Sequence, residues 1–215
     1  MKHYQIALDG PAGAGKSTLA KKLAAQLDFI YINSGGIYRS IAVALRDNNT
    51  DITDLKEVAK VLENSRVVQK GSRMFLNGQD INDRCYTQDI QNFVPLISPI
   101  HIIREASTKS QILTAANNNI VIEGRDTTTV VFPNATLKVF VTASQELRAQ
   151  RRWEQSGKQI SLEETLKDLI KRDSADMNRS ESPLKQADDA FVLDTTNLTE
   201  KEALDILISE FNKRK

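Results

Sequence analysis

Gly10-Pro-Ala-Gly-Ala-Gly15-Lys16-Ser17 is the stretch of this sequence that decides the fold. It matches the pattern G-x-x-x-x-G-K-[ST] at every fixed position. Residues 4–8 before it form a short apolar run that is typical of a buried strand. Residues 17–27 after it place leucine at 19, 23 and 27, along one side of a predicted helix. The sequence therefore predicts a strand, a glycine-rich turn and a helix in succession.

Such a turn is suited to binding a triphosphate. Glycines allow successive backbone N–H groups to curve around the phosphates, at the positive end of the dipole of the following helix. Lys16 can reach the β- and γ-phosphates, and the Ser17 hydroxyl can ligate Mg²⁺. A chance glycine turn would lack the flanking strand and helix, so we predict a phosphate-binding loop.

The composition is that of an ordinary globular protein. Of the 215 residues, 40% are hydrophobic and 27% are charged, and the formal net charge is +1. This balance gives no general footprint for nucleic acid or a membrane. A single cysteine and two histidines exclude an internal disulfide, a cysteine zinc site and a multi-histidine metal centre. We expect a soluble cytoplasmic monomer that binds neither nucleic acid nor membrane.

The segments after the loop predict an α/β fold. Further apolar runs are predicted strands, and helices separate them: 29–32, 120–122, 136–141 and 190–193. Such alternation is typical of a largely parallel sheet that is covered on both faces. Helix starts are predicted at Ser98-Pro99 and at the capping boxes Ser161-x-x-Glu164 and Thr199-x-x-Glu202.

One part of the chain interrupts this alternation. Residues 66–76 predict two short strands around a Lys70-Gly71 turn, after a helix over 54–62. We interpret residues 60–98 as a small lobe inserted into the core.

A phosphate-binding loop alone does not separate ATPases, GTPase switches and kinases. The Asn-Lys-x-Asp motif expected of a GTPase is absent from the sequence. Arginines are more informative, because a guanidinium grips phosphate with two parallel hydrogen bonds. Ser34 and Arg39 follow one predicted strand and Arg125 follows another, at the strand ends where ligands bind in open α/β sheets. Glu123 ends an apolar strand and is a candidate to hold Mg²⁺ through water.

Two further groups of arginines occur near the C-terminal end. Arg148, Arg151 and Arg152 share overlapping faces of a predicted helix, and Arg172 and Arg179 follow a linker over 153–161. Together they predict a lid made of two basic helical arms, although a solvated charged surface would give the same pattern.

These features indicate phosphoryl transfer to an acceptor that is itself anionic. Neither histidine lies beside a motif, so no catalytic base is evident. A phosphate monoester needs none, because its second pKa lies near 6 and it is already a nucleophilic oxyanion at pH 7. Catalysis would then depend on alignment and on charge neutralisation.

The sequence resembles bacterial-type cytidylate kinases, members of the nucleoside monophosphate kinase family. The resemblance covers nearly the whole chain, and separate motifs carry it in order. They are Ala7-Leu-Asp-Gly-Pro-Ala-Gly-Ala-Gly-Lys-Ser17, Asn33-Ser-Gly-Gly-Ile-Tyr-Arg39, Glu123-Gly-Arg-Asp126 with Val130-Val-Phe-Pro133, Arg172-Asp173 to Asn178-Arg179 with Ser182-Pro-Leu184, and Leu193-Asp-Thr-Thr196.

The resemblance implies a P-loop fold with a parallel five-stranded core sheet flanked by helices. It implies one kinase domain whose core covers about 1–59, 99–147 and 180–215, with an NMP-binding insert at 60–98 and a lid at 148–179. The implied reaction transfers phosphate from ATP to CMP or dCMP with Mg²⁺. A UMP- or shikimate-type kinase, and less readily a nucleotide-dependent switch, are the alternatives.

The resemblance also assigns site residues. ATP would bind to Gly10, Pro11, Ala12, Gly13, Ala14, Gly15, Lys16, Ser17 and Thr18. CMP would bind to Ser34, Arg39, Arg104, Arg125, Asp126, Asp176 and Arg179, where Arg104 and Asp126 read the cytosine edge and Asp176 holds the sugar hydroxyls. The catalytic set would be Lys16, Arg125, Arg172 and Arg179, with Mg²⁺ on Ser17 and, through water, Glu123. The chain departs from the family at Asn33, Glu123, Pro95 and Thr128, and the changes at Pro95 and Thr128 bear on its choice of base.

Overall fold

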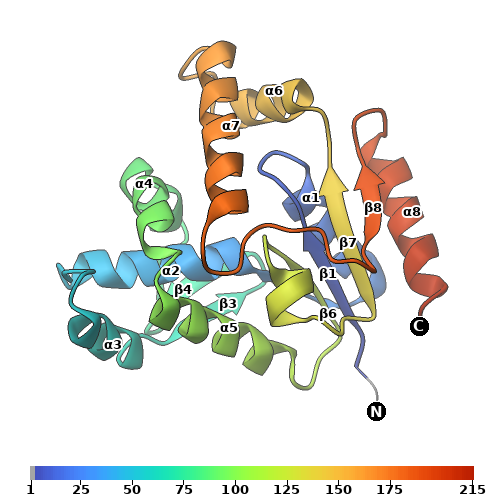
Figure 1. The fold of residues 1–215 in the computed structure, drawn as a ribbon. Helices are drawn as coiled ribbons and strands as arrows, with labels where there is room; N and C mark the ends of the chain where they lie inside the picture. Colours follow the sequence, from blue (N-terminus) through green and yellow to red (C-terminus); the bar gives the residue numbers. More distant parts are fainter. Residues whose placement is uncertain (1–2) are drawn as a thin grey trace. The chain divides into compact units, whose positions relative to one another are not determined.

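The computed structural model describes residues 3–215 and divides into two compact units (Figure 1). The first unit contains the chain up to Ile30 and then Asn118–Lys215. The second unit contains Tyr31–Asn117. The phosphate-binding loop lies in the first unit, and the predicted insert, 60–98, lies within the second.

The central sheet has five strands in the order β2-β6-β1-β7-β8 (Figure 1). Its strands are β1 (Gln5–Asp9), β2 (Ile30–Asn33), β6 (Ile120–Glu123), β7 (Leu137–Thr142) and β8 (Phe191–Asp194). The pairs β1–β6, β1–β7 and β7–β8 are parallel, and in this register Leu8 lies opposite both Glu123 and Val139. Strands β1 and β6 are buried almost throughout, as expected for a parallel sheet covered on both faces.

The helices of the first unit are α1 (Lys16–Leu27), α6 (Gln145–Gln155), α7 (Leu162–Asn178) and α8 (Glu200–Asn212), with a π-helical turn η2 (Thr127–Val131). Helix α1 packs on β1 and β6 and beside α8, with Leu19 and Leu23 buried. Helix α6 packs against α7. Both predicted capping boxes are confirmed, because Ser161 with Glu164 begins α7 and Thr199 with Glu202 begins α8.

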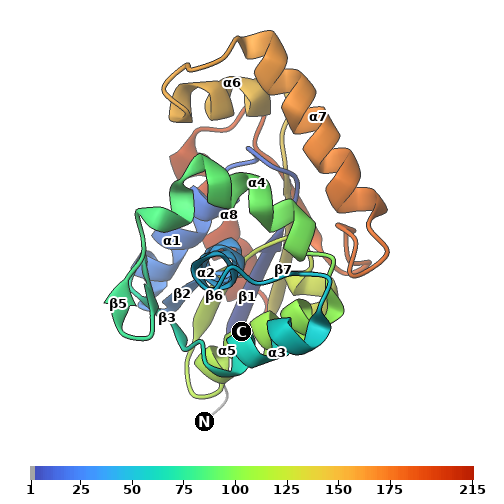
Figure 2. The same cartoon turned by 90° about the vertical axis from the view of Figure 1, so that its left-hand side faces the viewer.

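The second unit is built around α2 (Ser34–Asp47). Figure 2 looks along this helix, which contacts α3 (Leu55–Glu63), α4 (Gln88–Ile97) and α5 (His101–Ala115). It also contacts β3 (Val67–Lys70) and β4 (Arg73–Leu76), which form an antiparallel sheet with β5 (Gln79–Asp80). A short 3₁₀ turn, η1 (Arg84–Tyr86), precedes α4.

The predicted α/β architecture with a parallel five-stranded core is confirmed, and each strand lies within about one residue of its predicted position. One predicted helix start is wrong. Ser98 ends α4, because its N–H continues the helix by donating to the Val94 carbonyl, and α5 begins only at His101 after Ile100. Within residues 3–215, no helix has the length and apolarity that a membrane span requires.

Candidate functional site

The phosphate-binding loop connects β1 to α1, and two of its glycines cannot be replaced without a clash. A Cβ atom on Gly10 would lie 2.0 Å from the Val141 carbonyl oxygen, and one on Gly13 would lie 2.7 Å from that of Arg148. Both residues also have positive φ angles, 146° and 75°. The glycines therefore allow the loop to pack closely against its neighbours while it curves.

Lys16 is buried at the base of this loop. Its side chain is 5% exposed, and its Nζ donates to the Pro11 carbonyl at 2.7 Å. Burial, followed by the positive charge of Arg125, lowers the pKa of Lys16 from 10.5 to about 7, and Arg172 acts in the same direction. The charged form of Lys16 is therefore destabilised in the free protein, and an anion bound beside it would stabilise that form.

We expect ATP binding to take up a proton near pH 8. At that pH Lys16, with a pKa of about 7, is mostly neutral in the free protein, whereas phosphate oxygens beside it favour the charged form and raise its pKa. Calorimetric titration in buffers of different ionisation enthalpy measures the uptake, which should vanish below pH 6 and in Lys16→Met. An uptake that persists in Lys16→Met would contradict the assignment to this group.

A hydroxyl and a carboxylate meet beside the loop. The Ser17 hydroxyl donates to Glu123 Oε1 at 3.0 Å, and Glu123 is 6% exposed at the end of β6. Oxygen ligands of this kind suit Mg²⁺, which takes its remaining ligands from water and phosphate. In the part of the chain that the structure describes, no three acidic, histidine or cysteine side chains gather into a metal site.

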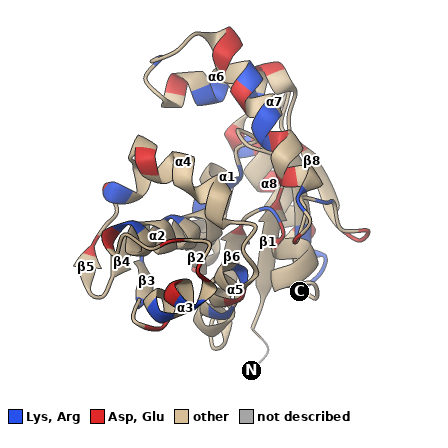
Figure 3. Cartoon of the chain, turned by 60° about the vertical axis from the view of Figure 1, so that its left-hand side comes forward, with Lys and Arg blue, Asp and Glu red and all other residues tan. Residues whose placement is uncertain are grey.

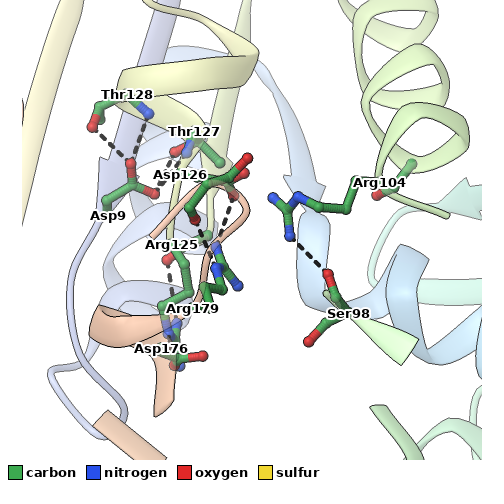
Figure 4. Close-up of polar contacts among 12 residues, drawn as sticks. Asp9, Ser98, Arg104, Arg125, Asp126, Thr127, Thr128, Asp176 and Arg179 are labelled. Atoms are coloured by element: carbon green, nitrogen blue, oxygen red, sulfur yellow. Dashed lines mark hydrogen bonds and ion pairs between the residues drawn. The ribbon is translucent and has the colours of Figure 1, made fainter. Parts of the chain in front are cut away.

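The predicted acceptor residues of the first unit are joined in two charged pairs. Arg125 Nε donates to Asp176 Oδ2 at 2.8 Å, and Arg179 Nη2 lies 3.8 Å from Asp126 Oδ1 (Figure 4). Burial opposes the charge of Arg125, but the Asp176 carboxylate outweighs it and raises the pKa of Arg125. Arg125 and Arg172 both lower the pKa of Lys16, so both guanidinium groups lie near the phosphate-binding loop.

Asp9, the last residue of β1, clamps the turn that follows Asp126. Its carboxylate accepts four hydrogen bonds, from the N–H and the hydroxyl of both Thr127 and Thr128 (Figure 4). Asp9 and Thr127 are fully buried, and Thr128 is 1% exposed. The clamp ties the strand before the loop to the turn that directly follows Arg125 and Asp126. Thr128, a departure from the family pattern, therefore has a structural role in this chain.

We expect Thr128→Val to lower the free energy of unfolding by about 1–2 kcal/mol, since it keeps the branched shape but removes a buried donor from Asp9. Urea denaturation should show a lower midpoint with an unchanged slope. The neighbouring Thr129 is a matched control, because its buried hydroxyl has no protein partner among the described residues. Thr129→Val should be neutral or stabilising, and equal losses at both positions would contradict the clamp.

Helices α6 and α7 carry mixed charges along their lengths (Figure 3). The arginines of α6 belong to the predicted lid, and Arg148 forms an ion pair with Asp173 of α7 at 2.5 Å. Arg151 donates to the hydroxyl and the carbonyl of Thr195, at 3.0 and 3.2 Å. The predicted linker is shorter than 153–161, because α6 runs to Gln155, and the Trp153 indole N–H donates to the Ile160 carbonyl at 2.7 Å.

The second unit holds the other predicted acceptor residues. Ser34 is buried at the first position of α2. Arg39, one turn later, lies over the Tyr86 ring at 4.7 Å, and its buried Nε has no hydrogen-bond partner among the described residues. Arg104 on α5 is 5% exposed and donates to the Ser98 carbonyl at 3.0 Å (Figure 4). Each arginine is thus ordered by contacts within its own unit.

One other departure from the family pattern has a local explanation, and nothing in the structure explains the departure at Pro95. Asn33 caps α2, because its side-chain oxygen accepts the Gly36 N–H at 2.9 Å. Pro95 lies inside α4, where it cannot donate a backbone hydrogen bond.

The site assignment from sequence omitted Asp9 and Asp173. Both carboxylates are buried. Asp173 accepts a hydrogen bond from the Ala12 N–H of the loop, and Asp9 accepts the N–H groups of Thr127 and Thr128 in the turn after Asp126. The available signals were that Asp9 directly precedes Gly10 and that Asp173 directly follows Arg172. Neither signal identifies the groups that these carboxylates contact.

Solved structures support the fold. A protein of Thermus thermophilus matches with a TM-score of 0.55 at 18% identity, covering all of both chains. Shikimate kinase of Bacteroides thetaiotaomicron matches with a TM-score of 0.51 at 12% identity, covering 97% of this chain and 98% of the other. At these identities the likeness concerns the fold alone, and it places the chain among α/β proteins of this topology.

Sequence comparison identifies the family. The family described as cytidylate kinase matches residues 6–213. The cytidylate kinase of Fusobacterium nucleatum is 40% identical over the full length of both chains. That of Caldanaerobacter subterraneus is 41% identical over 97% of this chain and 95% of its own. With the loop, the arginine pairs and this full-length similarity, the chain belongs to the cytidylate kinase family.

Proposed function

We propose that this chain transfers the γ-phosphate of ATP to CMP or dCMP, giving ADP and CDP or dCDP. The observation that carries the proposal is the electrostatic environment of Lys16. Arg125 follows β6 and Arg172 lies on α7. The positive charges of both arginines lower the pKa of Lys16 in the phosphate-binding loop. A hydrolase or switch needs positive charge only for its own triphosphate, whereas a second set of arginines suits an acceptor that is also a phosphate.

In this mechanism the loop holds ATP and the acceptor phosphate attacks in line. Backbone N–H groups of residues 13–18 would bind the phosphates, and Lys16 would contact the β- and γ-oxygens. The acceptor monoester attacks as an oxyanion and needs no general base. Arg125, Arg172 and Arg179 offset the charge that spreads over the transferred group. Alignment and charge neutralisation, rather than proton transfer, supply the rate.

We assign the metal to Ser17, with Glu123 acting through water. The hydroxyl and the carboxylate already contact each other, which supports the assignment. When bound, Mg²⁺ would neutralise phosphate charge and orient the nucleotide. Ser17 and Glu123 would then fix the place of the metal relative to the loop.

We also assign the residues that would bind the acceptor. Ser34, Arg39, Arg125 and Arg179 would hold its phosphate, and Asp176 would hold its sugar hydroxyls. Arg104 and Asp126 would read the cytosine, since a carboxylate can accept from the N4 amino group that uracil lacks. The unpartnered Nε of Arg39 supports a role for Arg39 in binding an anion.

The remaining parts of the proposal concern organisation. The insert at 60–98 would serve the acceptor and the segment 148–179 would serve as a lid that excludes water from ATP. One chain carries every assigned residue, so a monomer would suffice, and we expect it to act in the cytoplasm.

A panel of nucleoside monophosphates tests the function directly. The purified protein is mixed with ATP and Mg²⁺, and ADP release is measured with CMP, dCMP, UMP, AMP, GMP and, as a separate acceptor class, shikimate. CMP and dCMP should be phosphorylated at least about tenfold faster, as kcat/KM, than UMP. Equal rates with UMP would reject the assigned base selectivity, and ATP hydrolysis without any acceptor product would favour a switch.

A further inference from the structure

Arg148 on α6 and Asp173 on α7 form a buried ion pair beside the phosphate-binding loop. The two side chains are almost fully buried, and Arg148 Nη1 lies 2.5 Å from Asp173 Oδ2. A buried ion pair is weak evidence for stability, because the cost of desolvating both charges offsets their attraction. The role of this pair is therefore to be sought in what else it touches.

Both members of the pair bind the backbone of Ala12. The Ala12 N–H donates to Asp173 Oδ1 at 3.1 Å, and the Ala12 carbonyl accepts from Arg148 Nη1 at 3.0 Å. Arg148 is itself anchored, because its Nε donates to the Ala143 carbonyl at 3.0 Å just before α6. A single ion pair thus satisfies both backbone polar groups of one loop residue.

These contacts orient two successive peptide planes. In a trans peptide the N–H and the carbonyl point in opposite directions. The Ala12 N–H points to Asp173, so the Pro11 carbonyl points away from it, and this carbonyl is the one that Lys16 binds at 2.7 Å. The Ala12 carbonyl points to Arg148, so the Gly13 N–H points away from Arg148.

The neighbouring loop residues support the same picture. Gly13 packs against the backbone of Arg148 too closely for any side chain. The Ala14 carbonyl lies 3.4 Å from the Thr195 hydroxyl, which also lies 3.1 Å from the Thr142 carbonyl, and Thr195 is held by Arg151 of α6. Residues 12–14 are therefore all in contact with α6 or with a group that α6 or α7 holds.

We propose that Arg148 and Asp173 are positioning residues for ATP, which fix the two peptides flanking Ala12 so that Pro11 holds Lys16 and Gly13 presents its N–H to the phosphates. They act through the loop and are not phosphate ligands of a lid. The proposal rests on the proposed function, since it concerns the donor end of that kinase.

Equilibrium binding tests the proposal. Asp173→Ala should raise the Kd of a non-hydrolysable ATP analogue about tenfold, since a hydrogen bond to a charged group is lost. Asp173→Asn should raise it less, because the amide oxygen can still accept the Ala12 N–H. The Kd of CMP should change less than about twofold, since Asp176 and Arg179 keep their own partners. In steady-state kinetics the KM for ATP should rise more than kcat falls.

The matched control is Asp168→Ala, an exposed carboxylate on the same helix. It should leave both Kd values unchanged. A lower melting temperature in Asp173→Ala with an unchanged Kd for the ATP analogue would make the pair purely structural and would overturn the proposal. Equal losses of ATP and CMP affinity would also overturn it, because they would indicate displacement of the whole of α7.

Two further results keep the test decisive. If Asp173→Ala does not fold, the proposal is tested with Asp173→Asn and Arg148→Lys, each of which keeps part of the contact. The Kd values of the ATP analogue and of CMP are measured for these variants in the same way. Failure of the proposed function would look different. The parent protein would then bind the ATP analogue but phosphorylate no monophosphate, and the comparison of Kd values would still judge the pair.

Discussion

Replacing Lys16 with methionine should lower kcat about 10²–10³-fold while the Kd of CMP stays within about twofold. The buried ammonium would contact the β- and γ-phosphates. It would stabilise the transition state most, because negative charge develops on the transferred group there. In the free protein burial and the arginine charges hold the pKa of Lys16 at about 7. Rapid-quench or coupled-assay kinetics gives kcat, and calorimetry gives the CMP affinity.

The stability of the variant separates this effect from unfolding. The folded pKa of Lys16, about 7, lies below its value of 10.5 in the unfolded chain, so between these pH values the unfolded state binds more protons. The stability of the free parent protein should therefore rise with pH from 7 towards 10.5. Below pH 7 the full cost of burying the charge is present, so Lys16→Met should be at least as stable as the parent at pH 6.

Lys22→Met on the same helix is the matched control. Lys22 is exposed and pairs only with the surface residue Glu200 among the contacts of the described chain. It should leave kcat unchanged, as expected for an exposed ion pair. Turnover in Lys16→Met close to that of the parent would remove the lysine from the mechanism.

The loop could be predicted from sequence because its chemistry is local. Glycine spacing, the strand before Gly10 and the leucines of α1 each specify nearby backbone, and the structure confirms all of them. The capping boxes at Ser161 and Thr199 succeeded for the same reason, since a residue and its third neighbour satisfy each other. Ser98-Pro99 failed because α4 reaches Ser98 and uses its N–H, which the dipeptide alone does not reveal.

The partners of the site residues could not be predicted, because they come from distant parts of the chain. Arg148 has the same pattern as a solvated or phosphate-binding arginine until α7 brings Asp173 to it. Asp9 is separated from Thr128 by more than a hundred residues, and only the parallel pairing of β1 with β6 brings them together. Resemblance to a family supplied roles for single residues, whereas folding decides which carboxylate orients which arginine.

Replacing Asp126 with alanine should lower kcat/KM for CMP about 10²-fold and leave the Kd of the ATP analogue within about twofold. The carboxylate is 7% exposed and lies 3.8 Å from Arg179, so its removal takes away the acceptor proposed for the cytosine amino group and leaves a buried guanidinium without this partner. Losing one member of a desolvated charged contact costs about 2–5 kcal/mol. Initial rates with CMP and UMP, measured for parent and variant, give the two specificity constants.

The comparison of the two bases decides between two roles for Asp126. If it reads cytosine, the CMP-to-UMP ratio of kcat/KM should fall at least about tenfold, and Asp126→Asn should keep part of the ratio because its amide oxygen still accepts a hydrogen bond. If Asp126 acts only by orienting Arg179, kcat/KM should fall equally for CMP and UMP, because both nucleotides carry the same phosphate. Asp205→Ala, an exposed carboxylate on α8, should change neither constant. Equal losses for CMP and UMP would therefore assign Asp126 to the phosphate and leave base selection to other residues, such as Arg104.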